Sequence, residues 1–135
     1  MTFEEITNKE NFEFSNDLEL ELFTIHVYIE STQELGVETW QALREYGLID
    51  SGIRRFLFIF HKPAYKFSIS KQFLMRDYYN ENLDFFTGKV IAVVNDSPNL
   101  SAAISITQTT VNYMKLKIFS TEVAARDWVL KTLAV

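Results

Sequence analysis

The stretch KVIAVVNDSPNLSAAI, residues 89–104, has the clearest structural pattern in the chain. Its first part is an uninterrupted apolar run, which is typical of a strand buried on both faces of a parallel sheet. A polar turn follows at Asn95 and Asp96. Pro98 fits the first helical position, where its missing N–H needs no partner, and Ser97 fits the capping position, where its hydroxyl accepts a backbone N–H. The stretch therefore predicts a buried strand, a turn and a helix, the unit from which α/β folds are built.

The turn at residues 95–98 also has the form of a strand-to-helix junction that can bind phosphate. Two features argue against that use. Asp96 places a negative charge at the positive end of the predicted helix, and the turn has no glycine that would let a phosphate approach the backbone. We therefore interpret the turn as a self-capped helix start.

The N-terminal part of the chain predicts a hairpin and a helix. Residues 11–30 alternate apolar and polar side chains, with the leucines of residues 18–22 on one face, and Asn16 with Asp17 predicts the turn of an antiparallel hairpin. The helix covers residues 31–50: Ser31 and Glu34 have capping-box spacing, and Gly47 stands where a helix takes its left-handed C′ residue, with Leu48 folding back on the last turn.

The remaining sequence alternates between strands and helices. Apolar runs and 3.6-residue periodicities predict a strand at residues 54–61, a helix at 67–86, a strand at 115–119 and a helix at 120–135. Leu83 belongs to the inward stripe of the second of these, and Ser120 is the predicted N-cap of the last. The element order predicts an α/β fold with a mixed central sheet and about four helices around it, in a single domain over residues 1–135.

The composition excludes several classes of protein. The chain has no Cys, which excludes a disulfide framework, a thiolate metal site and a cysteine nucleophile. No apolar run approaches the roughly 18 residues of a membrane span, and the N-terminus lacks the apolar part of a secretory signal. We therefore expect a cytoplasmic protein that does not bind a membrane.

The net charge of −5 is divided unevenly. The first 50 residues hold 12 of the 18 acidic residues and two basic ones, Lys9 and Arg44, whereas residues 51–135 hold 6 acidic and 11 basic residues. The two parts either pair within one fold or form a dipolar surface for a charged partner or a second copy. Because the basic residues are dispersed and the chain is acidic overall, we expect no nucleic-acid partner.

The residues that commonly carry chemistry form no recognisable motif. His26 and His61 lie in separate predicted strands, and a third metal ligand at suitable spacing is missing, so the sequence predicts no metal and no cofactor. Asp77, Glu81 and Asp84 share one helix face, which is most simply a solvated face. Phosphate-loop and nucleophile-elbow motifs are also missing. We expect no enzyme, and His61 acting with a helix carboxylate is the remaining enzymatic alternative.

The helix predicted at residues 99–113 has no charged side chain. One stripe repeats at helical spacing and is expected to face inward: Leu100, Ala103, Ile104, Thr107 and Val111. The other stripe is the predicted interaction face, with a neighbour from the preceding helix: Ala102, Ile106, Thr109, Tyr113 and Phe73. An uncharged outer face is typical of a surface that a partner covers. A deeply buried helix is the alternative explanation.

Aromatic residues concentrate between residues 56 and 86 and suggest a second kind of site. His61 ends a buried strand, and open α/β sheets bind ligands beyond the carboxyl ends of their strands. We therefore predict a crevice for a small, partly apolar ligand, lined by His61, Tyr65, Tyr78 and Tyr79.

The second half of the chain resembles the SpoIIAA-like branch of the STAS-like domains. The resemblance rests on Asp96–Pro98 after an apolar strand, on Phe119 at a strand end, and on Ala125–Trp128 in a helix with an acidic start. It implies a mixed sheet with about four helices, in proteins that mostly bind partner proteins or small ligands without catalysis. Ser68 and Ser70 are the hydroxyls nearest to the group's phosphorylatable serine, but the motif around that serine is missing here.

These observations lead to one main hypothesis and two alternatives. We expect a non-enzymatic regulatory or protein-interaction module that forms a homodimer, or binds another protein, through the charge-free helix. The first alternative is a small ligand in the crevice near residues 61–79. The second is an enzyme that uses His61.

Overall fold

The structure, a computed structural model, describes residues 1–62, 65–66, 71 and 73–132, with the exception of the side chains of residues 65 and 66. Ser68, Ser70 and the Tyr65 side chain therefore lie outside the described residues. The helices are α1 Phe3–Thr7, α2 Gln33–Glu45, α3 Leu74–Glu81, α4 Leu83–Phe86, α5 Pro98–Thr110 and α6 Glu122–Lys131. The strands are β1 Phe12–Asp17, β2 Leu22–Val27, β3 Ser31–Thr32, β4 Arg55–Phe60, β5 Tyr65–Lys66, β6 Val90–Val94 and β7 Lys115–Phe119.

The central sheet is mixed and has the strand order β1-β2-β4-β6-β7. The hairpin partners β1 and β2 are antiparallel, and the other neighbours are parallel. The short strands β3 and β5 form a separate parallel pair. The predicted α/β fold with a mixed sheet is therefore confirmed.

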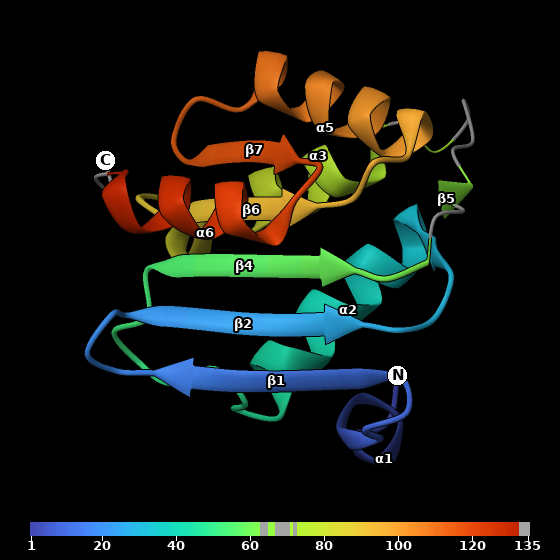
Figure 1. The fold of residues 1–135 in the computed structure, drawn as a ribbon, viewed down its shortest axis with the longest axis vertical. Helices are drawn as coiled ribbons and strands as arrows, with labels where there is room; N and C mark the ends of the chain where they lie inside the picture. Colours follow the sequence, from blue (N-terminus) through green and yellow to red (C-terminus); the bar gives the residue numbers. More distant parts are fainter. Residues whose placement is uncertain (63–64, 67–70, 72, 133–135) are drawn as a thin grey trace.

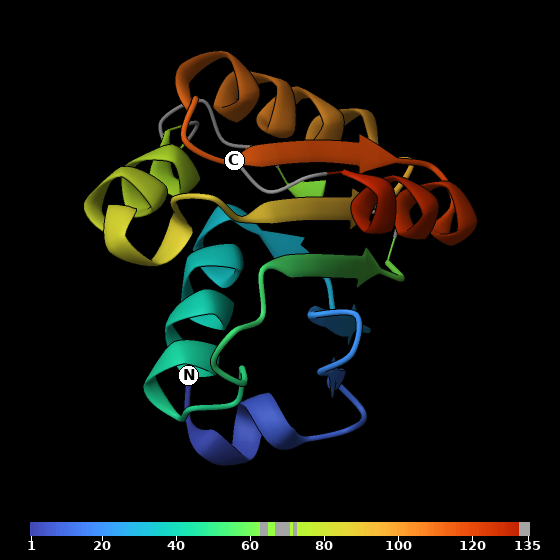
Figure 2. The same ribbon diagram turned by 90° about the vertical axis from the view of Figure 1, so that its left-hand side faces the viewer.

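The helices divide unequally between the two faces of the sheet (Figures 1 and 2). The chain crosses through α2, through α3 with α4, and through α5 on the same side, and these helices enclose the larger apolar core. On the opposite side α6 packs against β4, β6 and β7 over a smaller core that includes Ala125 and Val129. In Figure 1, α6 leaves the front of β1 and β2 uncovered.

The predicted hairpin exists, but its turn lies later than expected. The strand β1 continues to Asp17, whose carboxylate accepts a hydrogen bond from Leu20 N at 3.1 Å, and Leu18 is 65% exposed. Asn16 instead ties β1 to the loop after α2, because its amide donates to Leu48 O and accepts from Asp50 N, both at 2.9 Å. The prediction of an Asn16–Asp17 turn was therefore wrong.

The ends of α2 confirm one prediction and correct another. Gly47 has φ +63°, and Leu48 N–H donates to Leu43 O at 2.9 Å, as the predicted left-handed C′ residue requires. At the other end Thr32, and not Ser31, is the N-cap, and its hydroxyl accepts from Leu35 N at 3.1 Å. Ser31 belongs to β3, where its extended backbone serves strand pairing.

The helix predicted at residues 67–86 is broken at Asn82 into α3 and α4. The Asn82 amide donates to Tyr78 O at 2.8 Å, which removes a carbonyl from the backbone ladder, and its oxygen accepts from Arg44 at 2.9 Å. After the break, the helical phase changes and Leu83 is 45% exposed. The expectation that Leu83 faces inward was wrong.

Residues 89–104 form the predicted buried strand, turn and helix, but the helix is not capped as predicted. Every residue of β6 is buried, and Pro98 is the first residue of α5. The Ser97 hydroxyl makes no capping hydrogen bond. The turn is held instead by Asn95, whose oxygen accepts from Ser97 N at 2.8 Å and whose amide donates to Phe60 O and Lys62 O, both at 3.0 Å.

The last two helices also differ in their bounds from the prediction. Helix α5 ends at Thr110, so Tyr113 lies beyond it. Helix α6 begins after Thr121, whose hydroxyl accepts from Ala124 N at 3.3 Å, so the predicted cap at Ser120 was wrong by one position. No helix within the described residues has the length and apolar character needed to cross a bilayer.

Candidate functional site

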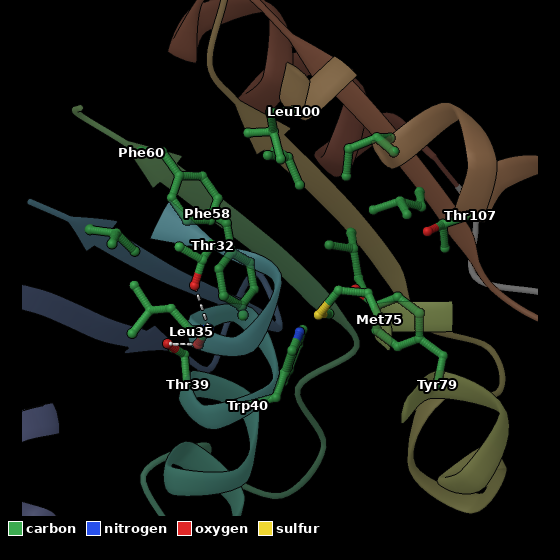
Figure 3. A pocket seen from close by; sticks show the side chains of 16 residues that line it. Thr32, Leu35, Thr39, Trp40, Phe58, Phe60, Met75, Tyr79, Leu100 and Thr107 are labelled. Atoms are coloured by element: carbon green, nitrogen blue, oxygen red, sulfur yellow. Dashed lines mark hydrogen bonds between the residues drawn. The ribbon is translucent and has the colours of Figure 1, made fainter. Parts of the chain in front are cut away.

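A cavity of about 70 Å³ lies between the sheet and the helices α2, α3 and α5 (Figure 3). Its floor comes from the parallel strands, with Val27, Phe58, Phe60 and Val93 in their second halves and Ile91 and Leu116 nearer their starts. These strands run in the same direction, and the cavity extends toward their carboxyl ends, where open α/β sheets commonly place ligands. Of the residues predicted to line a crevice near this end of the sheet, Tyr79 lines the cavity.

The walls of the cavity are mainly apolar, and the threonines in it form hydrogen bonds within or at the start of their own helix. Thr39 Oγ1 donates to Leu35 O at 2.7 Å, and Thr107 Oγ1 donates to Ala103 O at 3.2 Å. The hydroxyl of Thr32 accepts the capping N–H of Leu35, and the dashed lines in Figure 3 mark the bonds of Thr32 and Thr39. Apolar cavities of this kind remain dry and accept apolar molecules.

Met75 of α3 forms the adjustable part of the wall. It is half-buried and packs against Gly36 of α2, where an added Cβ would lie 2.9 Å from the Met75 sulfur. Glycine is unfavourable inside a helix by about 1 kcal/mol relative to alanine, but here it lets the thioether approach the α2 backbone. Met side chains are unbranched and flexible, so this wall can move without a change in the backbone.

The structure separates the residues of the predicted crevice. Tyr79 is 4% exposed and lines the cavity, whereas Tyr78 does not line it and accepts a hydrogen bond from Arg44 at 3.0 Å. His61 follows Phe60, which faces the cavity, and neighbouring strand positions point to opposite faces. His61 therefore lies on the other side of the sheet, and the prediction that His61, Tyr78 and Tyr79 line one crevice was wrong.

His61 instead meets His26, the other histidine of the chain. His26 Nδ1 and His61 Nε2 are 2.8 Å apart, and the Tyr28 ring stacks on His61 with a centroid distance of 4.7 Å. The Tyr28 hydroxyl donates to Glu13 at 3.3 Å. Partial burial, followed by the Glu13 carboxylate, raises the pKa of the Tyr28 phenol.

Within the described residues, the imidazole pair has neither a third metal ligand nor a carboxylate hydrogen-bond partner. The described residues contain no cluster of three or more His, Cys, Asp or Glu side chains that could hold a metal ion. Asp77, Glu81 and Asp84 are exposed, Asp77 pairs with Arg76 at 2.8 Å, and His26 is the hydrogen-bond partner that the described part of the chain offers His61. The helix carboxylates therefore do not give His61 the partner that acid–base chemistry would need.

The predicted interaction face is divided between two places. Ala102 and Thr109 are exposed on α5, and Ile106 between them is half-buried. Tyr113 lies after the helix, and its hydroxyl donates to Asn80 of α3 at 2.8 Å. Phe73 is 38% exposed at the start of α3, where the Arg76 guanidinium stacks 4.0 Å from its ring centroid.

The inward stripe of α5 is positioned as predicted. Leu100, Thr107 and Val111 are buried, and Leu100, Ile104 and Thr107 line the cavity. Trp40 and Met75 were not predicted as cavity residues, because the sequence pattern indicates only that they belong to the core. Gly36 was the available signal, since a glycine in the middle of a helix often marks a close approach.

Comparisons of the chain with protein-family models, with curated proteins and with solved structures found no match.

Proposed function

We propose that this chain is a non-enzymatic binding protein that takes a small, mainly apolar ligand into the cavity between the sheet and α2, α3 and α5. The observation that carries this proposal is the cavity of about 70 Å³ toward the carboxyl ends of the parallel strands, with apolar walls. An empty cavity is unfavourable by about 24 cal/mol per Å³, so a cavity of about 70 Å³ costs about 1.7 kcal/mol. A ligand that fills it regains the lost contacts.

The size of the cavity limits the ligand. Its volume of about 70 Å³ is roughly half that of an engineered cavity of about 150 Å³ that accepts benzene or xenon. A ligand of a few heavy atoms fits without rearrangement, and a larger one requires Met75 to turn away from the cavity. Met75 is suited to this because it is half-buried and flexible.

Xenon is the appropriate first probe, because it reports on an apolar cavity without any polar recognition. We expect xenon to shift the methyl NMR resonances of Leu35 and Ile104 in a saturable way. Ile104→Trp should abolish this effect by filling the cavity, whereas Ile106→Trp, on the other stripe of the same helix, should leave it unchanged. If xenon leaves the methyl resonances of the wild-type lining residues unmoved, the proposed function is wrong.

Self-association through α5 is a second candidate function. The supporting observation is that the helix has no charged residue from Pro98 to Thr110, while Ala102 and Thr109 are exposed. Light scattering should then give the mass of a dimer, and Ile106→Asp should reduce it to that of a monomer. Val123→Asp, at an 82% exposed position on α6, is the matched control. A wild-type protein that is monomeric at high concentration rejects this candidate.

We also propose that the fold is the SpoIIAA-like variant of the STAS-like domains. The support is the order of hairpin, helix and three further strand–helix units, together with the Asp96–Pro98 turn. An experimental structure with a different connection between sheet and helices would reject this assignment. Binding of a partner or ligand without catalysis is the behaviour that the resemblance implies.

A further inference from the structure

We propose that the ligand of this cavity carries a hydrogen-bond acceptor, such as a carbonyl or ether oxygen, and that this oxygen accepts from the indole N–H of Trp40. This inference rests on the proposed function and names the chemical class of the ligand. It follows from the packing of the Trp40 ring, from the state of its N–H group and from the state of the other polar groups in the cavity.

The Trp40 ring is held firmly in the core. The side chain is 2% exposed and forms edge-to-face contacts with Phe56 and Phe86, at centroid distances of 5.1 and 5.0 Å. A further contact with Phe85 lies at 5.9 Å. These rings fix the indole plane, so the direction of its N–H group is determined by packing and not by a hydrogen bond.

The N–H group of Trp40 is a buried donor that borders the cavity. Trp40 lines the cavity, and its nitrogen end points from α2 toward the Met75 sulfur in Figure 3. Within the described residues, no atom accepts a hydrogen bond from this N–H. The fully enclosed side-chain atoms that lack a partner there are Ser31 Oγ and Arg55 Nε, so the Trp40 nitrogen is not fully enclosed. The indole nitrogen therefore faces open space. A donor without an acceptor in the core is unfavourable, and a ligand oxygen would supply the missing hydrogen bond.

Trp40 is the candidate donor to a ligand because the other polar groups that line the cavity already have partners. The hydroxyls of Thr39 and Thr107 already donate to carbonyls of their own helices, and Tyr79 has an interaction of its own. The oxygen of a small ketone, ester or ether would match the donor that Trp40 offers.

An isosteric pair of probes tests this inference. Acetone and 2-methylpropene have the same shape, but acetone has an oxygen where 2-methylpropene has a methylene group. The chain has 2 Trp residues, so a ¹H–¹⁵N spectrum shows the indole protons of Trp40 and Trp128, and Trp128→Phe assigns them. We expect acetone to move the Trp40 indole proton downfield in a saturable way and to leave that of Trp128 unchanged. We expect 2-methylpropene to shift the Leu35 and Ile104 methyl resonances without that downfield movement.

The possible outcomes separate the two proposals. If both probes shift the methyl resonances and neither moves the Trp40 proton downfield, the cavity binds ligands without using the indole, and this inference is wrong while the proposed function stands. If neither probe nor xenon affects any lining residue, both proposals fail. Trp40→Phe should weaken acetone binding about two- to tenfold more than 2-methylpropene binding, the value of one neutral hydrogen bond. If that variant does not fold, the effect of acetone on the Trp40 indole proton of the wild type still tests the inference.

Discussion

Replacing Asn95 with Ala should destabilise the fold more than any other single change at the strand-to-helix turn. Asn95 is 8% exposed, and its amide group joins three segments of the chain. Its nitrogen donates to Phe60 O and Lys62 O, both at 3.0 Å, and its oxygen accepts from Ser97 N at 2.8 Å. One side chain therefore closes the end of β4, the end of β6 and the start of α5.

The magnitude follows from these bonds. Each neutral hydrogen bond contributes about 1 kcal/mol net, and a buried group left without a partner costs about 1–3 kcal/mol. Lys62 is exposed, so water can replace Asn95 at its carbonyl, whereas Ser97 is buried. We therefore expect Asn95→Ala to lower the free energy of unfolding by about 2–4 kcal/mol. Asn95→Asp should cost at least as much, because a carboxylate oxygen would face the carbonyls of Phe60 and Lys62.

Urea unfolding followed by tryptophan fluorescence measures this effect. The matched control is Asn112→Ala, at an exposed position, which should change the free energy of unfolding by less than about 0.5 kcal/mol. An Asn95→Ala protein within about 0.5 kcal/mol of the wild type would refute the reasoning. The turn would then be held by backbone geometry and by Pro98 alone.

Further predictions concern the glycines and the acidic start of α2. Gly47→Ala should destabilise by about 1 kcal/mol in urea unfolding, because φ is +63° there, and an unchanged stability would contradict the assignment of a left-handed residue. Gly36→Ala should change stability by less than about 1 kcal/mol, since the better helix propensity of alanine offsets the displacement of Met75, whose sulfur lies 2.9 Å from the new Cβ. The same substitution should weaken xenon binding by pushing Met75 into the cavity, and unaltered xenon shifts would show that Met75 moves elsewhere. The hydrogen bond from Lys71 lowers the pKa of Glu34 from 4.5. The unfolded chain then binds the proton first, so the contribution of Glu34 is present above pH 4.5 and is lost as the pH falls through its folded pKa. Glu34→Gln should therefore flatten acid unfolding below pH 4.5, and an unchanged acid slope would contradict the pairing.

The apolar periodicity of the sequence was sufficient to predict the layers of this fold, because apolar patterns indicate directly which residues are buried. The run at residues 90–94 is buried on both faces, as its unbroken hydrophobicity predicted. The alternation in residues 11–30 identified the antiparallel pair of β1 and β2. The C′ position of α2 at Gly47 followed from local chemistry, since few other residues accept a positive φ.

The errors occurred where a side chain is bound by a residue distant in sequence. Asn16 is not in a turn because Leu48 and Asp50 bind its amide. The long predicted helix breaks at Asn82, whose amide donates to Tyr78 O and accepts from the distant Arg44. Ser31 and Ser120 failed as caps in a different way, since a threonine at the next position, Thr32 or Thr121, took the role. At Ser97 no capping bond forms, and the Asn95 side chain accepts from Ser97 N instead. The lining of the cavity could not be predicted from one sequence, because a void depends on how the side chains pack together and not on any residue type.

The missing charge on α5 has an explanation that does not require a second copy of the chain. Without Lys, Arg, Asp or Glu between Pro98 and Thr110, the helix can form no ion pair with its neighbours. Several of its hydroxyls are bonded within the helix, as when Thr107 donates to Ala103 O and Thr110 to Ile106 O. The helix is therefore attached mainly through the apolar contacts of Leu100, Ala103 and Ile104 and through the bond from Gln108 to Leu116 O. Apolar contacts are non-directional, so a wall attached in this way can shift over a ligand at lower cost than one fixed by ion pairs. The same absence of charge that suggested an outer binding face is thus equally expected of a helix whose inner face closes a cavity.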